Sequence, residues 1–422
     1  MRPKMMEKKL RKRGIYVLPY KLIYGNVKEM IKLASEARSK PMELTHDIAP
    51  RVDPFLQQLS MIHKKPFAAW YGMVPRVTIM DPKLIREILT RKFEFRKPEV
   101  GLTMKFFLKG LANIDGDKWV KHRKIINPAF HIEKLKGMLP SFMASCEEMI
   151  EKWDNMMDSS AKSCELDVFP EFQNLTGDII SRAAFSSNLE EGRLIFSLQR
   201  KQAQLLLQSL FNLNSLWSRD DVIEECKLFY FAGHETTANL LAWTMIVLSM
   251  HQNWQEKARQ EVLQHIGKNK PTFDELNKLK LVNLILLEVL RLYPPTSLVR
   301  SIQEETKLGE YSLPAGVSLQ IPLYLIHRDP ELWGQDATEF NPERFSEGIS
   351  KASKDLQSPF FSFGWGPRTC IGQNFAMIEA KLALALILQH FSFELSPTYK
   401  HSPNVALTLQ PQFGAQVIIH KI

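Results

Sequence analysis

The stretch "FSFGWGPRTCIG", residues 361–372, places Cys370 among glycines, an arginine and aromatic residues, directly before a long apolar segment. A thiol at the start of a helix meets unsatisfied backbone N–H groups and the positive end of the helix dipole, and both favour the thiolate. Such a thiolate could act as a nucleophile or bind a metal, whereas a buried thiol would be inert. A nucleophile needs a nearby base, and this stretch has no histidine. A cysteine without companion ligands suits a metal whose other positions are filled by a macrocycle.

A second motif, "FAGHETTAN", lies inside a predicted helix. Gly233 costs about 1 kcal/mol in a helix interior relative to alanine, and Thr236 follows three residues later on the same face. This pairing would let a flat group approach the backbone and meet a hydroxyl. A close helix crossing, with the threonine bonded back to a carbonyl, would explain it equally well. His234 and Glu235 also begin a zinc-protease motif, but Ala238 stands where the second histidine would be, which excludes that class.

Two charged residues stand alone in the apolar run "LILLEVLRLYPP". Glu288 and Arg291 are three residues apart, so they share one helix face. Burying either charge by itself would cost several kcal/mol, so we expect the two to pair with each other and with a third partner. Arg344 in "FNPERF" is the candidate third member. The role predicted for this network is to stabilise the fold.

A tryptophan and an arginine share a helix turn in "GDKWVKHRK". Trp119 and Arg123 are four residues apart, so they lie on one face of the predicted helix. An arginine beside an indole can hold an anion against an aromatic wall, or it can lie on a solvated surface. Taken alone, this segment favours the solvated surface.

The composition of the 422-residue chain limits its class. Hydrophobic residues make up 45% and charged residues 24%, which is typical of a globular protein with a sizeable core. The four cysteines lie far apart without a Cys-x-x-Cys pair, which argues against a structural zinc site and a disulfide framework. The net charge of +9 is spread along the chain among acidic residues, so nucleic-acid binding is disfavoured.

These candidate residues need helices and a small β-rich part to position them. We predict helices over residues 118–130, 134–157, 220–252, 281–295 and 370–391. We predict β structure over 67–82 and 307–330, and a final hairpin over 405–422. The fold class is therefore mainly α with a small β-rich subdomain, and the chain is expected to form one domain over 1–422. The β segments at the two ends of the sequence are expected to meet in space.

Five motifs together resemble those of the cytochrome P450 superfamily, in that family's order. The pattern F-x-x-G-x-R-x-C-x-G is matched by Phe363, Gly366, Arg368, Cys370 and Gly372, and resembles the haem-binding loop. The segment "AGHET" is similar to the oxygen-activation segment, "EVLR" to the E-x-x-R motif, and "FNPERF" to the aromatic-Pro-Arg loop. Trp119 to Arg123 resembles the W-x-x-x-R motif. Further phrases are most similar to the plant branch that includes secologanin synthase.

The resemblance implies a cytochrome P450 fold, with haem b (iron protoporphyrin IX) between a long distal helix and the helix that follows the cysteine loop. It implies that Cys370 is the proximal iron ligand and that Gly233 lies against the distal haem face. Glu235 and Thr236 would deliver protons during O2 activation. The residues expected to contact haem or its propionates are Trp119, Arg123, Arg300, Phe363 and Arg368.

The same resemblance implies partners and a location. Electrons would come from NADPH-cytochrome P450 reductase, docking on a basic face near Lys121, His122 and Lys124. The substrate would be a lipophilic small molecule, such as a plant terpenoid-like specialised metabolite or hormone, with O2 as co-substrate. The enzyme would lie on the cytosolic face of the endoplasmic reticulum membrane. The basic segment 1–13 resembles the juxtamembrane part of the family, but no apolar run reaches the roughly 18 residues of a membrane span, so the anchor itself is expected to be absent.

One internal departure from the family affects the predicted activity. Residues 193–211 resemble the start of the helices that roof the substrate pocket, and residues 220–225 resemble the start of the oxygen-binding helix. Only "NLNSLWSR", residues 212–219, lies between them, where the family has several dozen residues. We therefore carry two hypotheses, a monooxygenase and a truncated haem-binding or non-functional paralogue without catalysis.

Overall fold

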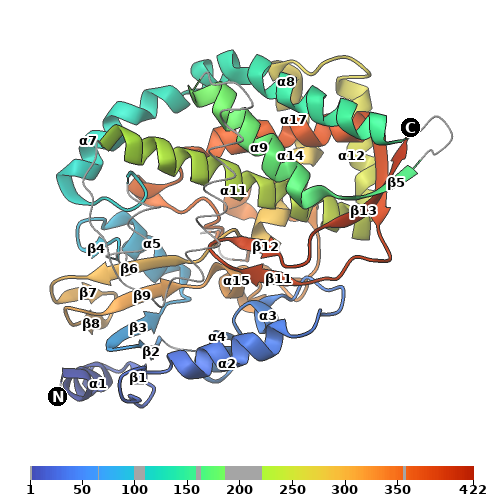
Figure 1. Ribbon diagram of the computed structural model, residues 1–422. Helices are drawn as coiled ribbons and strands as arrows, with labels where there is room; N and C mark the ends of the chain where they lie inside the picture. Colours follow the sequence, from blue (N-terminus) through green and yellow to red (C-terminus); the bar gives the residue numbers. More distant parts are fainter. Residues whose placement is uncertain (1, 65, 99–109, 158–162, 186–220, 355–357) are drawn as a thin grey trace. The chain divides into compact units, whose positions relative to one another are not determined.

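The computed structural model describes residues 2–64, 66–98, 110–157, 163–185, 221–354 and 358–422 (Figure 1). The predicted deletion at 212–219 and the preceding roof segment lie outside these residues. The chain forms two compact units. Unit 1 comprises Met1–Glu99, Leu287–Cys370 and Lys400–Phe413, and unit 2 comprises Val100–Leu286, Ile371–Tyr399 and Gly414–Ile422.

Unit 1 contains most of the β structure. Its helices are α1 (Arg2–Lys12), α2 (Val27–Arg38), α3 (Ala49–Val52), α4 (Pro54–Ile62), α5 (Pro82–Thr90), α15 (Leu323–Ile326), α16 (Pro330–Trp333) and the end of α14 (Lys280–Leu292). Its strands are β1 (Tyr16–Val17), β2 (Phe67–Tyr71), β3 (Val74–Thr78), β4 (Phe95–Arg96), β6 (Leu298–Ile302), β7 (Thr306–Leu308), β8 (Tyr311–Leu313), β9 (Ser318–Ile321), β11 (Pro403–Val405) and β12 (Leu409–Pro411). Short 3₁₀ helices span Pro342–Phe345, Ile349–Lys351 and Gly366–Arg368.

A six-stranded sheet in the order β1-β2-β3-β9-β6-β4 organises unit 1. The β2–β3 hairpin turns at Gly72, whose positive φ of 61° suits a glycine. Strand β3 pairs in parallel with β9, with Val77 opposite Leu319. Segments more than 200 residues apart in the sequence thus meet in one sheet, as predicted for 67–82 and 307–330, whereas the strands within 405–422 belong to other sheets.

Unit 2 is mainly helical. It contains α7 (Gly116–Ile126), a 3₁₀ helix (Asn127–Phe130), α8 (Ile132–Met156), α9 (Val168–Phe185), α11 (Asp221–Met250), α12 (Gln252–His265), α13 (Phe273–Lys278), α17 (Gln373–His390) and the start of α14. Helices α8, α9, α11 and α17 pack against one another (Figure 1). The second half of α11 is buried on all its faces, since residues 237–249 are all buried, as expected for the central helix of a helical core. Strands β5 (Ser163–Asp167), β10 (Phe391–Leu395) and β13 (Gln416–Lys421) form one sheet in the order β10-β13-β5.

Two of the predicted β segments differ from the structure. The final hairpin is wrong, because β12 pairs with β11 while β13 pairs with β10 and β5. The alternation that buries Val417 and Ile419 predicts a strand but does not name its partner. The predicted β structure up to residue 330 also ends early, since Leu323–Ile326 is a helical turn. Pro322 has no N–H for a sheet ladder, and its carbonyl accepts from the amides of Leu325 and Ile326 instead.

The predicted helices agree with the structure to within a few residues, and two of the differences occur next to a proline or a glycine. Helix α14 ends at Leu292, before two consecutive prolines. Helix α17 begins at Gln373, three residues after Cys370, instead of at Cys370. None of the helices in the described ranges combines the length and apolar character needed to span a bilayer.

Candidate functional site

The loop that carries Cys370 in unit 1 is held by its own backbone. The Cys370 amide donates to the Phe363 carbonyl over 2.8 Å, and the Thr369 hydroxyl donates to the same carbonyl over 3.3 Å. The Gly364 amide donates to the Phe361 carbonyl over 2.8 Å. The Cys370 side chain itself is exposed. The loop therefore presents a thiol outward from a backbone that hydrogen bonds hold in place.

Glycine is required in this loop where it meets α5. Gly366 has a positive φ of 68°, and a Cβ added to it would lie 2.9 Å from the Leu89 carbonyl oxygen. Gly364 also has a positive φ, of 74°. A side chain at Gly366 would push the loop away from α5, so the glycine pattern noted in the sequence reflects close backbone approach.

Two arginines of unit 1 were predicted to contact the cofactor. Arg300 lies on β6, is 4% exposed, and donates from Nη1 to the Val299 carbonyl over 2.8 Å. Arg368 ends the 3₁₀ helix just before Cys370 and is partly buried, as is Phe363. Unit 1 thus supplies the thiol together with these two cations.

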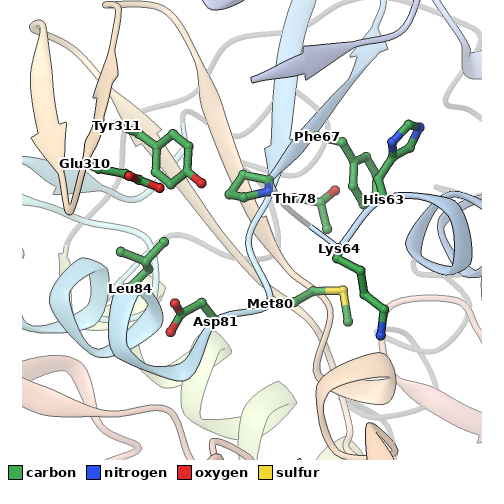
Figure 2. Close-up of a pocket in the computed structure, with 10 residues that line it drawn as sticks. His63, Lys64, Phe67, Thr78, Met80, Asp81, Leu84, Glu310 and Tyr311 are labelled. Atoms are coloured by element: carbon green, nitrogen blue, oxygen red, sulfur yellow. The ribbon is translucent and has the colours of Figure 1, made fainter. Parts of the chain in front are cut away.

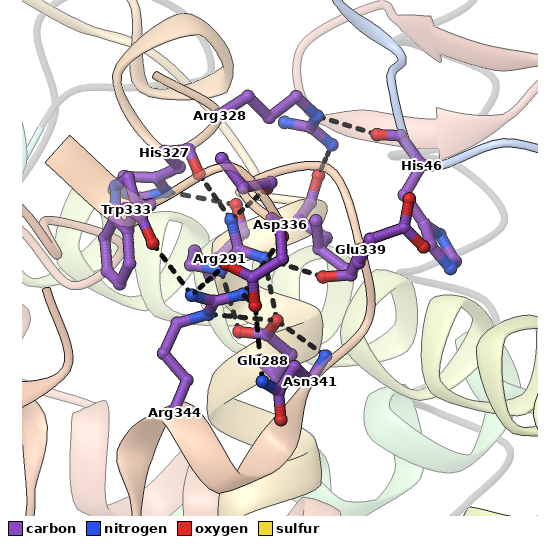
Figure 3. A network of polar contacts seen from close by, with 12 residues as sticks. His46, Glu288, Arg291, His327, Arg328, Trp333, Asp336, Glu339, Asn341 and Arg344 are labelled. Atoms are coloured by element: carbon purple, nitrogen blue, oxygen red, sulfur yellow. Dashed lines mark hydrogen bonds and ion pairs between the residues drawn. The ribbon is translucent and has the colours of Figure 1, made fainter. Parts of the chain in front are cut away.

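The structure brings the three predicted network residues together (Figure 3). Glu288 and Arg291 are both fully buried and share two hydrogen bonds of 2.7 Å. Arg344 Nε lies 3.5 Å from Glu288 Oε1, and Arg344 also pairs with Asp336 at 2.9 Å. The Asn341 amide donates to Glu288 Oε1 over 3.0 Å. The carboxylate therefore receives donors from α14 and from the loop 336–344, which it joins.

Arg291 also organises backbone groups that the sequence did not reveal. Its guanidinium donates to the carbonyls of His327 over 2.5 Å, Ala337 over 2.6 Å and Glu339 over 3.1 Å. Arg328, which follows His327 in the sequence, is also buried and donates to the His46 carbonyl over 2.7 Å (Figure 3). Burial lowers the pKa of Arg328 to about 9, against the raising effect of nearby Tyr293.

His327 is a residue of this region that sequence reasoning missed. It is fully buried, and burial, together with the charges of Arg291 and Arg328, lowers its pKa to about 3. The available signal was the dipeptide of His327 and Arg328 directly after an apolar run, since charged and polar residues there need partners.

In unit 2, α11 carries the predicted distal residues. A Cβ on Gly233 would lie 3.2 Å from Ile180 Cδ1 on α9, so the glycine permits a close helix crossing. The Thr236 hydroxyl donates to the Ala232 carbonyl one turn earlier over 2.6 Å. Both features match the structural alternative considered for this motif. Glu235 is partly buried, with 16% of its side chain exposed and its Oε2 4.0 Å from His234 Nδ1.

Helix α7 carries the predicted residues Trp119 and Arg123, which differ in their burial. Trp119 is 5% exposed and packs with Leu111 and Leu228, while Arg123 is partly buried. The neighbouring His122 is turned inward, since its Nδ1 lies 2.7 Å from Glu225 Oε1 and only 14% of its side chain is exposed. His122 therefore pairs with a carboxylate of α11, while reductase docking on a basic face near Lys121, His122 and Lys124 stays a prediction.

A pocket of about 410 Å³ lies in unit 1 (Figure 2). His63 and Lys64 lie on one side and Glu310 and Tyr311 on the other, with Asp81 between them. Its lining includes none of the candidate site residues. We therefore do not identify it with the predicted site.

The type and number of metal-ligand atoms that these side chains offer indicate whether they suit haem. Within the described ranges, no group of three or more His, Cys, Asp or Glu side chains is placed to hold a metal ion. Cys370 offers one soft sulfur ligand on an exposed side chain. This set fits iron whose other ligands come from a macrocycle, and it does not fit a metal held by protein side chains alone.

Known proteins resemble this chain along its whole length. The sequence profile of the family described as Cytochrome P450 matches residues 48–215 and 189–418. Cytochrome P450 72A15 of Arabidopsis thaliana is 45% identical over 483 aligned residues, which cover 100% of this chain and 94% of the relative. Cytochrome P450 CYP72A219 of Panax ginseng is 47% identical over 490 residues, with the same coverage. The 11-oxo-beta-amyrin 30-oxidase of Glycyrrhiza uralensis is 46% identical over 492 residues, again covering 100% and 94%.

The chain therefore belongs to the cytochrome P450 family, a class of haem-binding monooxygenases. Within it, the chain falls in the plant 72 branch, as its similarity to the 72A relatives shows. The aligned lengths of 483 and 492 residues exceed the chain's 422 residues by 61 and 70.

Proposed function

We propose that this chain inserts one oxygen atom of O2 into a lipophilic plant metabolite, with electrons from an NADPH-dependent reductase. The observation that carries the proposal is the exposed Cys370 thiol on a loop fixed by the hydrogen bond from its own amide to the Phe363 carbonyl. The chemistry supplied by bound haem is the reduction and cleavage of O2 and the transfer of one oxygen atom.

Cys370 is the residue that would hold the iron, as a thiolate. By the family resemblance, Trp119, Arg123, Arg300 and Arg368 would bind the propionates by charge-assisted hydrogen bonds. Burial of Arg300 supports this role, because a buried guanidinium gains most from an anionic partner.

Two residues of α11 would move protons. The Glu235 carboxyl is partly exposed, so it can exchange protons with water and pass them inward. The Thr236 Oγ1 already donates to the Ala232 carbonyl, so its lone pairs remain available to accept a proton or a hydrogen bond. To act as a relay, the Thr236 hydroxyl would turn away from the Ala232 carbonyl, give its own proton to the oxygen to be protonated and take one back from Glu235 through a lone pair.

The partners of the reaction follow the family. The reductase would dock on exposed lysines of α7, of which Lys121 and Lys124 remain after His122 is assigned to Glu225. The basic helix α1 would lie near the anionic surface of the endoplasmic reticulum membrane. The relative whose name gives 11-oxo-beta-amyrin as its substrate supports a terpenoid-like substrate for this chain.

A second candidate function has its own support. The relatives carry at least 61 more aligned residues than this chain, and the family profile matches in two overlapping blocks that meet at residues 189–215. This supports an internal deletion near 212–219. A pocket without part of its roof would admit water, and the chain would then bind haem without productive oxidation.

The test is the spectrum of the reduced carbon monoxide complex of the full chain with haem. We expect the strongly red-shifted band of thiolate ligation, and we expect Cys370→Ala to abolish it. Cys164→Ala is the matched control, since Cys164 lies on β5 and is only partly exposed. Survival of the band in Cys370→Ala would overturn the ligand assignment. A normal band without consumption of any lipophilic substrate would favour the second function.

A further inference from the structure

His327 links the buried charge network to the start of the cysteine loop. Its Nδ1 lies 3.2 Å from the Arg291 carbonyl oxygen on α14, and its Nε2 lies 3.2 Å from the Phe361 amide nitrogen. Phe361 precedes Cys370 by nine residues, and its carbonyl accepts from Gly364 in the same loop. One imidazole therefore joins α14 to the segment that leads into the loop.

The two partners determine the protonation of the ring. A backbone carbonyl can only accept a hydrogen bond and a backbone amide can only donate one. The ring must therefore be neutral, with its proton on Nδ1 and its lone pair on Nε2. Burial and the charges of Arg291 and Arg328 favour this neutral form more strongly than the carbonyls of Arg291 and Pro359 oppose it.

Aromatic contacts fix the plane of the ring. His327 stacks on Phe360 with centroids 5.7 Å apart and planes 12° from parallel. Trp333 meets it edge-on at 6.1 Å. With both nitrogens hydrogen-bonded and the ring in contact with Phe360 and Trp333, the ring cannot rotate without breaking contacts, so Phe361 is held at a fixed place relative to α14.

A second hydrogen bond reinforces the same connection. The Ser362 hydroxyl donates to the Leu290 carbonyl over 2.8 Å, so adjacent residues of the loop segment are both tied to α14. The serine bond is partly buried, whereas the His327 bonds are fully buried. The imidazole is therefore the stronger constraint of the two.

We propose that His327 is a positioning residue that sets the cysteine loop for iron ligation by holding the Phe361 amide and the Arg291 carbonyl together. The proposal rests on the proposed role of Cys370 as the haem ligand. It predicts that both ring nitrogens are needed to hold the cysteine loop in place, and that an aromatic ring without them does not hold it.

Two variants separate hydrogen bonding from packing. His327→Phe keeps an aromatic ring beside Phe360 but removes both hydrogen bonds. His327→Gln loses the ring but keeps one donor and one acceptor. His401→Phe is the matched control, because His401 is another buried histidine of unit 1 whose ring bonds a carbonyl, that of Thr45.

The first measurement needs no haem. Hydrogen exchange of the Phe361 amide in the full chain, before haem is added, should be about tenfold faster in His327→Phe than in the unmodified chain. It should return to within about twofold in His327→Gln and be unchanged in His401→Phe. If His327→Phe does not fold, the unmodified chain still decides, since its Phe361 amide must exchange about tenfold more slowly than that of exposed Trp365. Equal exchange at the two amides would refute the proposal.

The second measurement is the fraction of haem that gives the thiolate-type carbon monoxide spectrum. We expect this fraction to fall at least about twofold in His327→Phe relative to His401→Phe, and to recover in His327→Gln. Equal fractions in His327→Phe and His401→Phe would overturn the positioning role while leaving the Cys370 assignment intact. Retention of the band by Cys370→Ala would instead refute the proposed function itself.

Discussion

The buried pair of Glu288 and Arg291 gives a sharp quantitative prediction. Glu288→Gln changes the side-chain volume very little but removes a negative charge. Among the described contacts of Arg291, Glu288 is the only carboxylate beside its fully buried guanidinium. The substitution also replaces one acceptor with an N–H group that must face the donors of Arg291. Removing one partner of a buried ion pair costs about 3–5 kcal/mol, because the other charge stays buried without compensation. Total stabilities are about 5–15 kcal/mol, so this one substitution removes a large share.

The assay is urea unfolding of the full chain followed by far-ultraviolet circular dichroism. The matched control is Glu133→Gln, which makes the same chemical change in another i, i+3 pair. Glu133 lies 3.5 Å from Lys136, but their side chains are 77% and 43% exposed. This control should alter the free energy of unfolding by no more than about 0.5 kcal/mol. A loss below about 1 kcal/mol in Glu288→Gln would refute the claim that the network carries substantial stability.

Two further predictions concern packing and pH. Gly233→Ala should destabilise the chain by about 1 kcal/mol, because the crowding of Ile180 outweighs the gain in helix propensity. In a double-mutant cycle, Ile180→Val should relieve that cost. Additive effects of the two changes would contradict the close crossing. Burial and the Arg51 charge lower the pKa of His401 to about 4. Between pH 6.5 and 4 the unfolded chain therefore binds one more proton than the folded chain, so the free energy of unfolding falls as the pH falls through this window. His401→Phe should remove about 1.4 kcal/mol per pH unit from that slope in urea titrations, and an unchanged slope would show that His401 is not its source.

The sequence by itself indicated five of the helices and the loop that carries Cys370. The spacing of apolar residues in 220–252 and 134–157 predicts α11 and α8 to within two residues at each end, because helical periodicity depends on neighbours along the chain. Cys370, its glycines and the pair of Glu288 and Arg291 were likewise visible, since an isolated charge in an apolar run needs a partner close in sequence.

Only the tertiary structure decided which distant groups meet. The pairing of β13 with β5, the inward turn of His122 toward Glu225 and the two bonds of His327 all join residues more than 30 positions apart. Local patterns state that a strand or a polar side chain needs a partner, but strand pairing and buried hydrogen bonds are satisfied by whichever group the folded chain brings near. For that reason the sequence indicated the loop that is proposed to hold the iron, whereas the residue proposed to hold that loop in place emerged only from the folded protein.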